Sequence, residues 1–359
     1  GGSVELTLDP VAQEVAFGAL QRGLGQGPFV GSVAAVRPST GEVLTLASSP
    51  SFDPNALSSQ DEAVRTQEMQ RIEQNPDRPL LNHATQQALP PGSTMKVITT
   101  AAALEQGLGP DTPVSGADRT LLPGTATYLQ NYAGQTCGGG TVTLRTALEL
   151  SCNVPFVEIS QEIGPEAFTE MAEKFGVDGA VPEDFGIPVA PSGLGQMEDA
   201  AQLAMSAIGQ SDVRMTTLQS AMVAATVSNG GVRMEPQLIR SLTAPDLSVV
   251  RGFTPRDAGR ALTDDQAATL TDMMIGAELN AGGGLPGVTI ASKTGTAEHG
   301  VDASASVPYT WYIAFVPGQD VAVAVAIESG PGITRGTVGT DHAAPIGREV
   351  LGALLGGTP

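Results

Sequence analysis

Lysine is nearly absent from this chain of 359 residues, in which only three of the 18 basic residues are lysines. Lysine can lose its proton inside a folded site, whereas arginine effectively cannot. A chain that uses arginine for almost every positive charge is therefore expected to keep lysine where arginine cannot substitute. The three lysines are Lys96, Lys174 and Lys293.

Long apolar runs and a basic character are also missing. No apolar run approaches the roughly 20 residues that are needed to cross a bilayer. The formal net charge of −20 argues against nucleic acid and against anionic membrane surfaces as partners. The three histidines (His83, His299 and His342) are scattered without metal-ligand spacing, so we expect no metal and no other cofactor.

Only two cysteines are present, Cys137 and Cys152. Composition alone leaves two alternatives open, a pair of free buried thiols or one disulfide. In the chain-entropy model, a bridge that closes a loop of about 15 residues would stabilise the fold by roughly 3 kcal/mol.

Strand patterns lie near both ends of the chain and helical patterns lie between them. Residues 30–36 and 42–47 are typical of a hairpin, and so are residues 309–316 and 321–329. The last of these strands is apolar on both faces, so we expect it to be central, with a close-packed helix at about 343–355 against its alanine face. These patterns predict a mixed α/β fold, in which an antiparallel sheet is assembled from both ends of the chain and flanked by helices.

The order of the patterns also predicts the division into domains. We expect residues 1–24 to be a tag scar, Gly1-Gly2-Ser3, followed by the remnant of an N-terminal membrane-proximal region. The main domain then covers residues 25–359. An all-helical lobe, roughly 93–280, is expected between the sheet segments 28–50 and 286–359.

The first chemical motif is Ser93-Thr94-Met95-Lys96, which runs directly into a helical pattern. With Ser93 at or near the helix N-cap, Lys96 lies one turn later on the same face and can act as base for a serine nucleophile. A lysine with the ordinary pKa of about 10.4 is a poor base at neutral pH, so burial or a second ammonium must lower it. Taken alone, a serine three residues before a lysine is more commonly a simple helix cap followed by a surface charge.

Two further motifs lie downstream. Ser151-Cys152-Asn153 places a hydroxyl and an amide together, either to handle a proton and a substrate amide or simply to cap a helix. Lys293-Thr294-Gly295-Thr296 follows a strand pattern and offers the second ammonium together with two hydroxyls. The glycine allows another backbone to approach the strand closely. A solvated edge strand is the alternative interpretation of this motif.

In this order, Ser-x-x-Lys, Ser-x-Asn and Lys-Thr-Gly resemble the signature of the penicillin-recognising serine acyltransferases. The flanking sequence resembles class B penicillin-binding proteins, and among them the actinobacterial members, along nearly the whole chain. The segments that carry this resemblance are 38–43, 47–55, 208–210, 217–219, 228–231, 291–300 and 344–347, together with the two cysteines.

The resemblance implies a fold, an activity and a set of partners. The fold would be that of the penicillin-binding protein and serine β-lactamase group, with a five-stranded antiparallel sheet beside the helical lobe. The activity would be peptidoglycan D,D-transpeptidation through an acyl-enzyme on Ser93. Partners would be D-alanyl-D-alanine stem peptides as donor, an amine acceptor, β-lactams as covalent inhibitors, and a glycan polymerase with division or elongation proteins.

The resemblance also implies roles for residues of the first two motifs. Ser93 would attack the penultimate D-alanine carbonyl, and Lys96 would take the serine proton. Ser151 would pass a proton to the leaving amine with the help of Lys293. Asn153 would bind the substrate amide and hold Lys96.

The third motif would bind the donor. Thr294 and Thr296, on either side of Gly295, would hold the terminal carboxylate. The backbone N–H groups of Ser93 and Thr296 would form the oxyanion hole.

A family that acts outside the cytoplasmic membrane favours the Cys137–Cys152 bridge, which would restrain the loop of the second motif. It also implies a single N-terminal anchor in the full-length protein. Three alternatives share the motifs: a β-lactamase, a D,D-carboxypeptidase, and a β-lactam sensor or inactive scaffold. The glutamate loop of class A β-lactamases, Glu-x-x-x-Asn, does not occur between residues 153 and 200.

Overall fold

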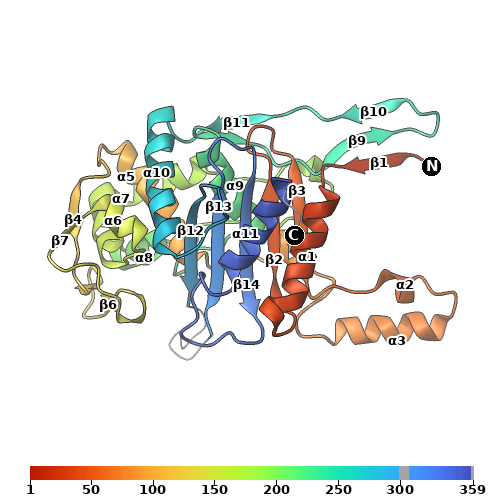
Figure 1. Ribbon diagram of the computed structural model, residues 1–359, viewed down its shortest axis with the longest axis horizontal. Coiled ribbons are helices and arrows are strands. Elements are labelled where there is room, and N and C mark those ends of the chain that lie inside the picture. Colours follow the sequence, from red (N-terminus) through yellow and green to blue (C-terminus); the bar gives the residue numbers. More distant parts are fainter. Residues whose placement is uncertain (299–306, 357–359) are drawn as a thin grey trace.

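The computed structural model describes residues 1–298 and 307–356. His299, one of the three histidines considered above, lies outside the described residues. The centre of the molecule is a sheet of five antiparallel strands in the order β12-β13-β14-β2-β3, so that the two ends of the chain meet at the β14–β2 pair (Figure 1). The strands are β2 (Val30–Val36), β3 (Val43–Ser49), β12 (Ala291–Ala297), β13 (Tyr309–Phe315) and β14 (Ala322–Ser329).

One face of the sheet is covered by the first and last helices, α1 (Pro10–Arg22) and α11 (Ala343–Leu354). Asp9 begins α1 as expected, because its carboxylate accepts hydrogen bonds from the N–H groups of Val11 and Ala12, both at 2.9 Å. Residues 1–24 thus supply a helix that packs on the sheet.

The central strand β14 is buried on both faces, as the sequence predicts, but the assignment of its faces was wrong. The valine face packs against α11, whereas the alanine face packs against α9 (Thr217–Ser228). The reason lies in the helices. The glycine of α11, Gly347, lets that helix approach the Tyr312 and Val325 side chains closely, so a helix fits tightly even over the larger residues.

Five further helices form the lobe beyond β12, with α10 packed along that edge strand (Figure 1). The lobe also contains the longest helix, which is kinked at Gly164–Pro165. Its helices are α5 (Lys96–Glu105), α6 (Leu144–Glu149), α7 (Val154–Lys174), α8 (Ala200–Ala207) and α10 (Asp264–Asn280).

Short elements complete the fold. Two small antiparallel strand pairs lie between α5 and α6, within residues 113–143. The small sheets are built from β1 (Ser3–Leu6), β9 (Ile239–Thr243) and β10 (Val249–Gly252), from β8 (Val232–Met234) and β11 (Asp257–Arg260), from β4 (Pro113–Ser115) and β7 (Thr141–Thr143), and from β5 (Arg119–Leu121) and β6 (Tyr128–Gln130). The short helices are α2 (Pro54–Leu57), α3 (Glu62–Glu73), α4 (His83–Gln86) and the 3₁₀ turns η1 (Gly23–Gly25), η2 (Gly92–Met95), η3 (Tyr132–Gly134) and η4 (Glu183–Phe185).

The predicted fold class is confirmed: the fold is mixed α/β, with an antiparallel five-stranded sheet and flanking helices. Strands that are more than 200 residues apart in sequence pair because each has one face that must be buried against the same helices. Among the residues that the structure describes, no helix is both long and apolar enough to span a bilayer.

Candidate active site

Ser93 lies on the 3₁₀ turn η2, which continues directly into α5. It is not a helix cap, as one interpretation of the sequence had it, because no side chain caps either element. The turn is fixed by backbone contacts. The Gly92 N–H donates to the Gly209 carbonyl at 2.9 Å, and the indole of the single tryptophan, Trp311, donates to the Pro90 carbonyl at 2.8 Å. Ser93 is thereby held, partly exposed, at the wall of a cavity.

Lys96, the first residue of α5, is fully buried. Its ammonium donates to the Ser151 carbonyl at 2.7 Å and to Oδ1 of Asn153 at 2.8 Å, and it lies 5.5 Å from the centre of the Phe156 ring. The first motif therefore meets the second motif through Lys96. This contact joins residues that are 57 positions apart in the chain.

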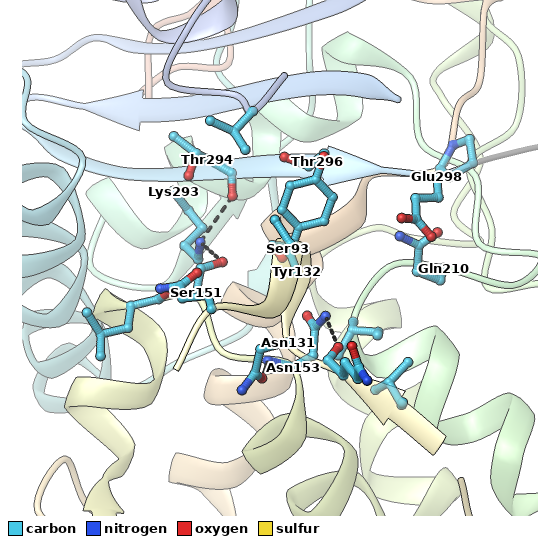
Figure 2. Close-up of a pocket in the computed structure, with 18 of the residues that line it drawn as sticks. Ser93, Asn131, Tyr132, Ser151, Asn153, Gln210, Lys293, Thr294, Thr296 and Glu298 are labelled. Carbon is cyan, nitrogen blue, oxygen red and sulfur yellow. Dashed lines mark hydrogen bonds between the residues drawn. The ribbon is translucent and has the colours of Figure 1, made fainter. Parts of the chain in front are cut away.

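Lys293 joins the third motif to the second. It lies on the edge strand β12 and is 1% exposed, and its ammonium donates to Oγ of Ser151 at 2.6 Å and to the Thr294 carbonyl at 3.0 Å. Thr294 and Thr296 follow it along the strand and line the cavity (Figure 2).

Gly295 shows why this strand carries a glycine. A Cβ atom at this position would lie 2.7 Å from the Pro91 carbonyl oxygen and 3.0 Å from the Thr94 methyl group. Because real Cβ atoms do not approach a carbonyl oxygen so closely, only glycine lets β12 pack directly on the Ser93 turn. The expected close backbone approach is confirmed.

The ammonium groups of Lys96 and Lys293 are both buried, and burial disfavours the charged form of a lysine. Burial, and then the nearby charge of Lys293, hold the pKa of Lys96 well below its ordinary value. Burial lowers the pKa of Lys293 to about 7. The third lysine, Lys174, instead pairs with Glu105 at 2.7 Å and Glu170 at 3.0 Å near the surface. The site therefore contains two lysines whose pKa values are lowered by the fold, that of Lys293 to about 7.

The second motif sits on a strained and cross-linked loop between α6 and α7. Ser151 has a φ of +60°, a left-handed conformation that is uncommon for residues other than glycine. The next residue, Cys152, is bonded to Cys137 in a disulfide, which confirms the predicted bridge. Both cysteines are fully buried. The bridge ties the loop to the segment that follows the β5–β6 hairpin.

All three motifs converge on one cavity of about 1250 Å³. Lys96 and Gly295 are buried behind its wall rather than in it. The predicted residues that line the cavity are Ser93, Ser151, Asn153, Lys293, Thr294 and Thr296.

The sequence analysis missed Asn131, which organises the second motif. It is 2% exposed, and its Oδ1 accepts hydrogen bonds from the N–H groups of Asn153 at 2.8 Å and Val154 at 3.1 Å. The Gln130 carbonyl accepts from Nδ2 of Asn153 at 3.1 Å. The β5–β6 hairpin therefore both caps α7 and orients the amide of Asn153. An asparagine just after a short hairpin was the only available signal.

The sequence analysis also missed Glu278, which anchors the edge strand from behind. This carboxylate on α10 is 2% exposed and accepts from Ser292 at 2.5 Å, from the Tyr312 hydroxyl at 3.0 Å and from Nε of Arg348 at 2.7 Å. Since β12 has a strand neighbour on one side only, this network fixes its position relative to α10 and α11. In the described part of the chain, histidine, cysteine and acidic residues form no group of three that would hold a metal ion.

A serine on a turn that leads into a helix shares a site with two buried lysines, and the fold joins an antiparallel sheet to a helical lobe. These features are typical of the penicillin-recognising serine acyltransferases. Residues 31–352 match the model of the penicillin-binding protein transpeptidase domain. The chain therefore belongs to this family.

Individual relatives agree with this assignment. The chain is 47% identical over 360 residues to the peptidoglycan D,D-transpeptidase PbpA of Mycolicibacterium smegmatis. The aligned region covers 99% of this chain and 73% of that protein. Its fold matches penicillin-binding protein A of Mycobacterium tuberculosis, solved as a ceftriaxone acyl-enzyme, with a TM-score of 0.95 and 45% identity over 99% of this chain and 80% of that one. The penicillin G acyl-enzyme of the same protein matches with a TM-score of 0.93. The expected similarity to actinobacterial members is confirmed.

Proposed function

We propose that this chain is a serine peptidoglycan D,D-transpeptidase that forms its acyl-enzyme on Ser93 and is acylated there by β-lactams. The observation that carries the proposal is the convergence of Ser93, the Ser151–Asn153 loop and the Lys293–Thr296 strand on one cavity, behind which Lys96 is buried with a lowered pKa. The high identity to a named D,D-transpeptidase along the whole chain supports the same activity.

In the first step, Oγ of Ser93 attacks the carbonyl carbon of the penultimate D-alanine. Neutral Lys96 accepts the serine proton, and its lowered pKa favours this neutral form. The carbonyl oxygen becomes an oxyanion that the N–H groups of Ser93 and Thr296 stabilise. Asn153 contributes by orienting Lys96 through the 2.8 Å hydrogen bond and by offering its amide to the donor peptide.

In the second step, the tetrahedral intermediate collapses and the bond to the terminal D-alanine nitrogen breaks. The leaving nitrogen receives a proton from Oγ of Ser151, which Lys293 replenishes across the 2.6 Å hydrogen bond. Thr294 and Thr296 hold the terminal carboxylate until it leaves. An ester between Ser93 and the donor peptide remains.

The third step repeats the chemistry in reverse. An amine of a second stem peptide attacks the ester carbonyl, a new amide bond forms, and Oγ of Ser93 leaves and recovers a proton from Lys96. A β-lactam enters the same site as the donor does, but its leaving nitrogen stays attached, so the ester persists.

The decisive experiment is mass spectrometry after incubation with penicillin G. We expect a stable adduct of one β-lactam per chain on Ser93, and none in Ser93→Ala. Ser211→Ala removes another serine that lines the cavity and is the matched control, which is expected to acylate normally. An unmodified wild-type protein would refute the proposal. Rapid turnover of a chromogenic cephalosporin would indicate a β-lactamase, and an acyl-enzyme that transfers to water but never to an amine would indicate a carboxypeptidase.

We further propose that the protein works at the extracytoplasmic face of the cell membrane, held there by a single N-terminal anchor. The Cys137–Cys152 disulfide supports a location outside the reducing cytoplasm. Peptidoglycan strands must be polymerised before they are cross-linked, so a glycan polymerase and division or elongation proteins are the expected partners. Co-purification of the full-length protein from membranes tests both points.

A further inference from the structure

Tyr132 connects two segments that border the cavity and lie 203 positions apart in the chain. It lies on η3, directly after Asn131, and lines the cavity. Its ring points from the Asn131 side of the cavity toward β12 (Figure 2), and its hydroxyl donates to the backbone carbonyls of Arg335, at 3.1 Å, and Thr337, at 3.3 Å. None of the three motifs includes Tyr132, and no step proposed above uses it.

On one side, Tyr132 belongs to a segment that is fastened to the Ser151 loop at several points. These links between residues 131–137 and 150–153 are the Asn131–Asn153 hydrogen bond at 2.8 Å, the Gln135–Leu150 hydrogen bond at 2.9 Å and the Cys137–Cys152 disulfide. Tyr132 lies between the first two of them in the chain. A displacement of Tyr132 would therefore also displace the loop that carries Ser151 and Asn153.

On the other side, the two accepting carbonyls lie in the loop between β14 and α11, which packs on the third motif. A Cβ atom at Gly339 would lie 2.9 Å from the Gly295 carbonyl oxygen and 3.1 Å from Cβ of Thr294, so the loop backbone touches β12 there. Val338 and Thr340, on either side of Gly339, line the cavity. The loop therefore extends the wall that β12 forms.

Under the proposed function, the donor lies between these two walls. Its leaving nitrogen faces Ser151 on one wall, and its terminal carboxylate faces Thr294 and Thr296 on the other. The hydrogen bond from Lys293 to Ser151 connects the walls at one point, and the Tyr132 hydroxyl connects them at a second. Two connections restrain the relative rotation of the walls more than one does, so Tyr132 helps to fix the distance between the proton donor and the threonines.

We propose that Tyr132 is a positioning residue for the acylation step: its hydroxyl holds the Ser151 loop at a fixed distance from β12 while both walls bind the donor. The inference rests on the proposed function and assigns a part in it to a residue outside the three motifs. Because both walls bind the donor most tightly in the transition state, loss of the hydroxyl should slow acylation more than it weakens the initial complex.

The Tyr132 hydroxyl differs from the lysine contacts because it is neutral. Burial, and then the charges of Glu298 and Asp341, raise its pKa, so it stays protonated near neutral pH. Removing it should therefore lower the acylation rate by one constant factor across this range. A residue that transferred protons would instead change the shape of the pH profile.

The test separates binding from acylation in Tyr132→Phe, which removes the hydroxyl and keeps the ring. Rapid mixing with penicillin G gives the dissociation constant of the initial complex and the rate constant of acylation. We expect the rate constant to fall about fivefold, the effect of one neutral hydrogen bond, while the dissociation constant stays unchanged. The pH profile should keep its shape, and the final amount of adduct should remain one per chain.

Two further variants test the specificity of the effect. Tyr128→Phe makes the same change at the other tyrosine that lines the cavity, and it should acylate like the wild type. The ring of Tyr128 lies 4.6 Å from the Arg119 guanidinium, and its hydroxyl has no hydrogen bond within the described residues. Thr337→Val loosens the accepting loop, because it removes the Oγ1 that accepts from the Thr334 N–H at 2.8 Å. Combined with Tyr132→Phe, it should slow acylation less than the product of the two single effects.

Four results would overturn the inference. A wild-type rate constant in Tyr132→Phe would show that the hydroxyl does not matter, and an altered pH profile would assign it to proton transfer. A smaller final amount of adduct at an unchanged rate constant would assign Tyr132 to folding. Effects of Tyr132→Phe and Thr337→Val that multiply would show that the two act separately. All are compared with a wild-type protein that forms its adduct, so they differ from failure of the proposed function, in which Ser93 is never acylated.

Discussion

The two walls of the cavity are held in position in different ways. On one wall, the Ser93 turn and β12 are fixed by direct backbone packing, with Gly92 and Gly295 providing the space for that contact. On the other wall, the Ser151 loop is held by links: the Cys137–Cys152 disulfide, the Asn131 cap and the two lysine ammonium groups. A nucleophile and an oxyanion hole need fixed backbone atoms, whereas a proton relay depends on side chains.

The packed wall should be the more sensitive to small changes of volume. In Gly92→Ala, the new Cβ would collide with the Thr296 carbonyl, and Gly92 has a φ of +53°. Because a shift of about 1 Å at a reacting group costs on the order of 100-fold in rate, we expect acylation by penicillin G to slow by about that factor. Stopped-flow measurement of adduct formation checks this prediction.

The matched control for Gly92→Ala is Gly107→Ala. Gly107 also has a positive φ, of +91°, but a Cβ there would meet open space. This variant carries the backbone strain without the collision, so its acylation rate should stay near wild type. Equal rates for the two variants would contradict the idea that close packing of β12 on η2 sets the geometry.

The two lysines that connect the walls, Lys96 and Lys293, should determine how the acylation rate depends on pH. Lys96 must be neutral to accept the serine proton, so the rate rises as pH increases through its lowered pKa. Lys293 must be protonated to supply Ser151, so the rate falls, by up to tenfold per pH unit, above its pKa of about 7. In Lys293→Arg the cation no longer titrates in this range, and the alkaline fall should disappear. A fall that persists in Lys293→Arg would assign it to another group.

The linked wall should tolerate the loss of its disulfide with the smallest change in rate. In Cys137→Ser/Cys152→Ser, we expect the free energy of unfolding to drop by roughly 3 kcal/mol, the value for a loop of about 15 residues. The remaining links still hold Ser151, so acylation should slow only a few-fold at temperatures where the variant is folded. Chemical unfolding and adduct formation measure the two effects. If the double variant lost as much acylation rate as Gly92→Ala, the proposed difference in sensitivity between the two walls would be wrong.

Much of this site was predictable because most of its reacting and binding residues belong to three short sequence motifs. Spacing and resemblance named Ser93, Lys96, Ser151, Asn153, Lys293 and the two threonines. The structure brings them together at one cavity, with Lys96 buried behind its wall. Asn131 and Glu278 were not named in this way. Each acts through hydrogen bonds to distant segments, and a single polar residue in a hairpin or helix has no pattern of its own.

The fold shows the same division. The alternation of valine and alanine in β14 determined that this strand is central and buried on both faces. It did not determine which helix covers which face, because that depends on how closely each helix approaches. Gly347 decided it for α11.

The sequence by itself determined the reacting groups, the order of the motifs and the class of fold, since these follow from residue type and periodicity. Only the tertiary structure decided how those groups behave. Folding buries Lys96 and Lys293, and this burial lowers the pKa of both; the nearby charge of Lys293 lowers that of Lys96 further. Ser151 receives its hydrogen bond from a lysine 142 positions away. Burial and long-range contact are properties of the folded chain, and they convert three common motifs into one reactive site.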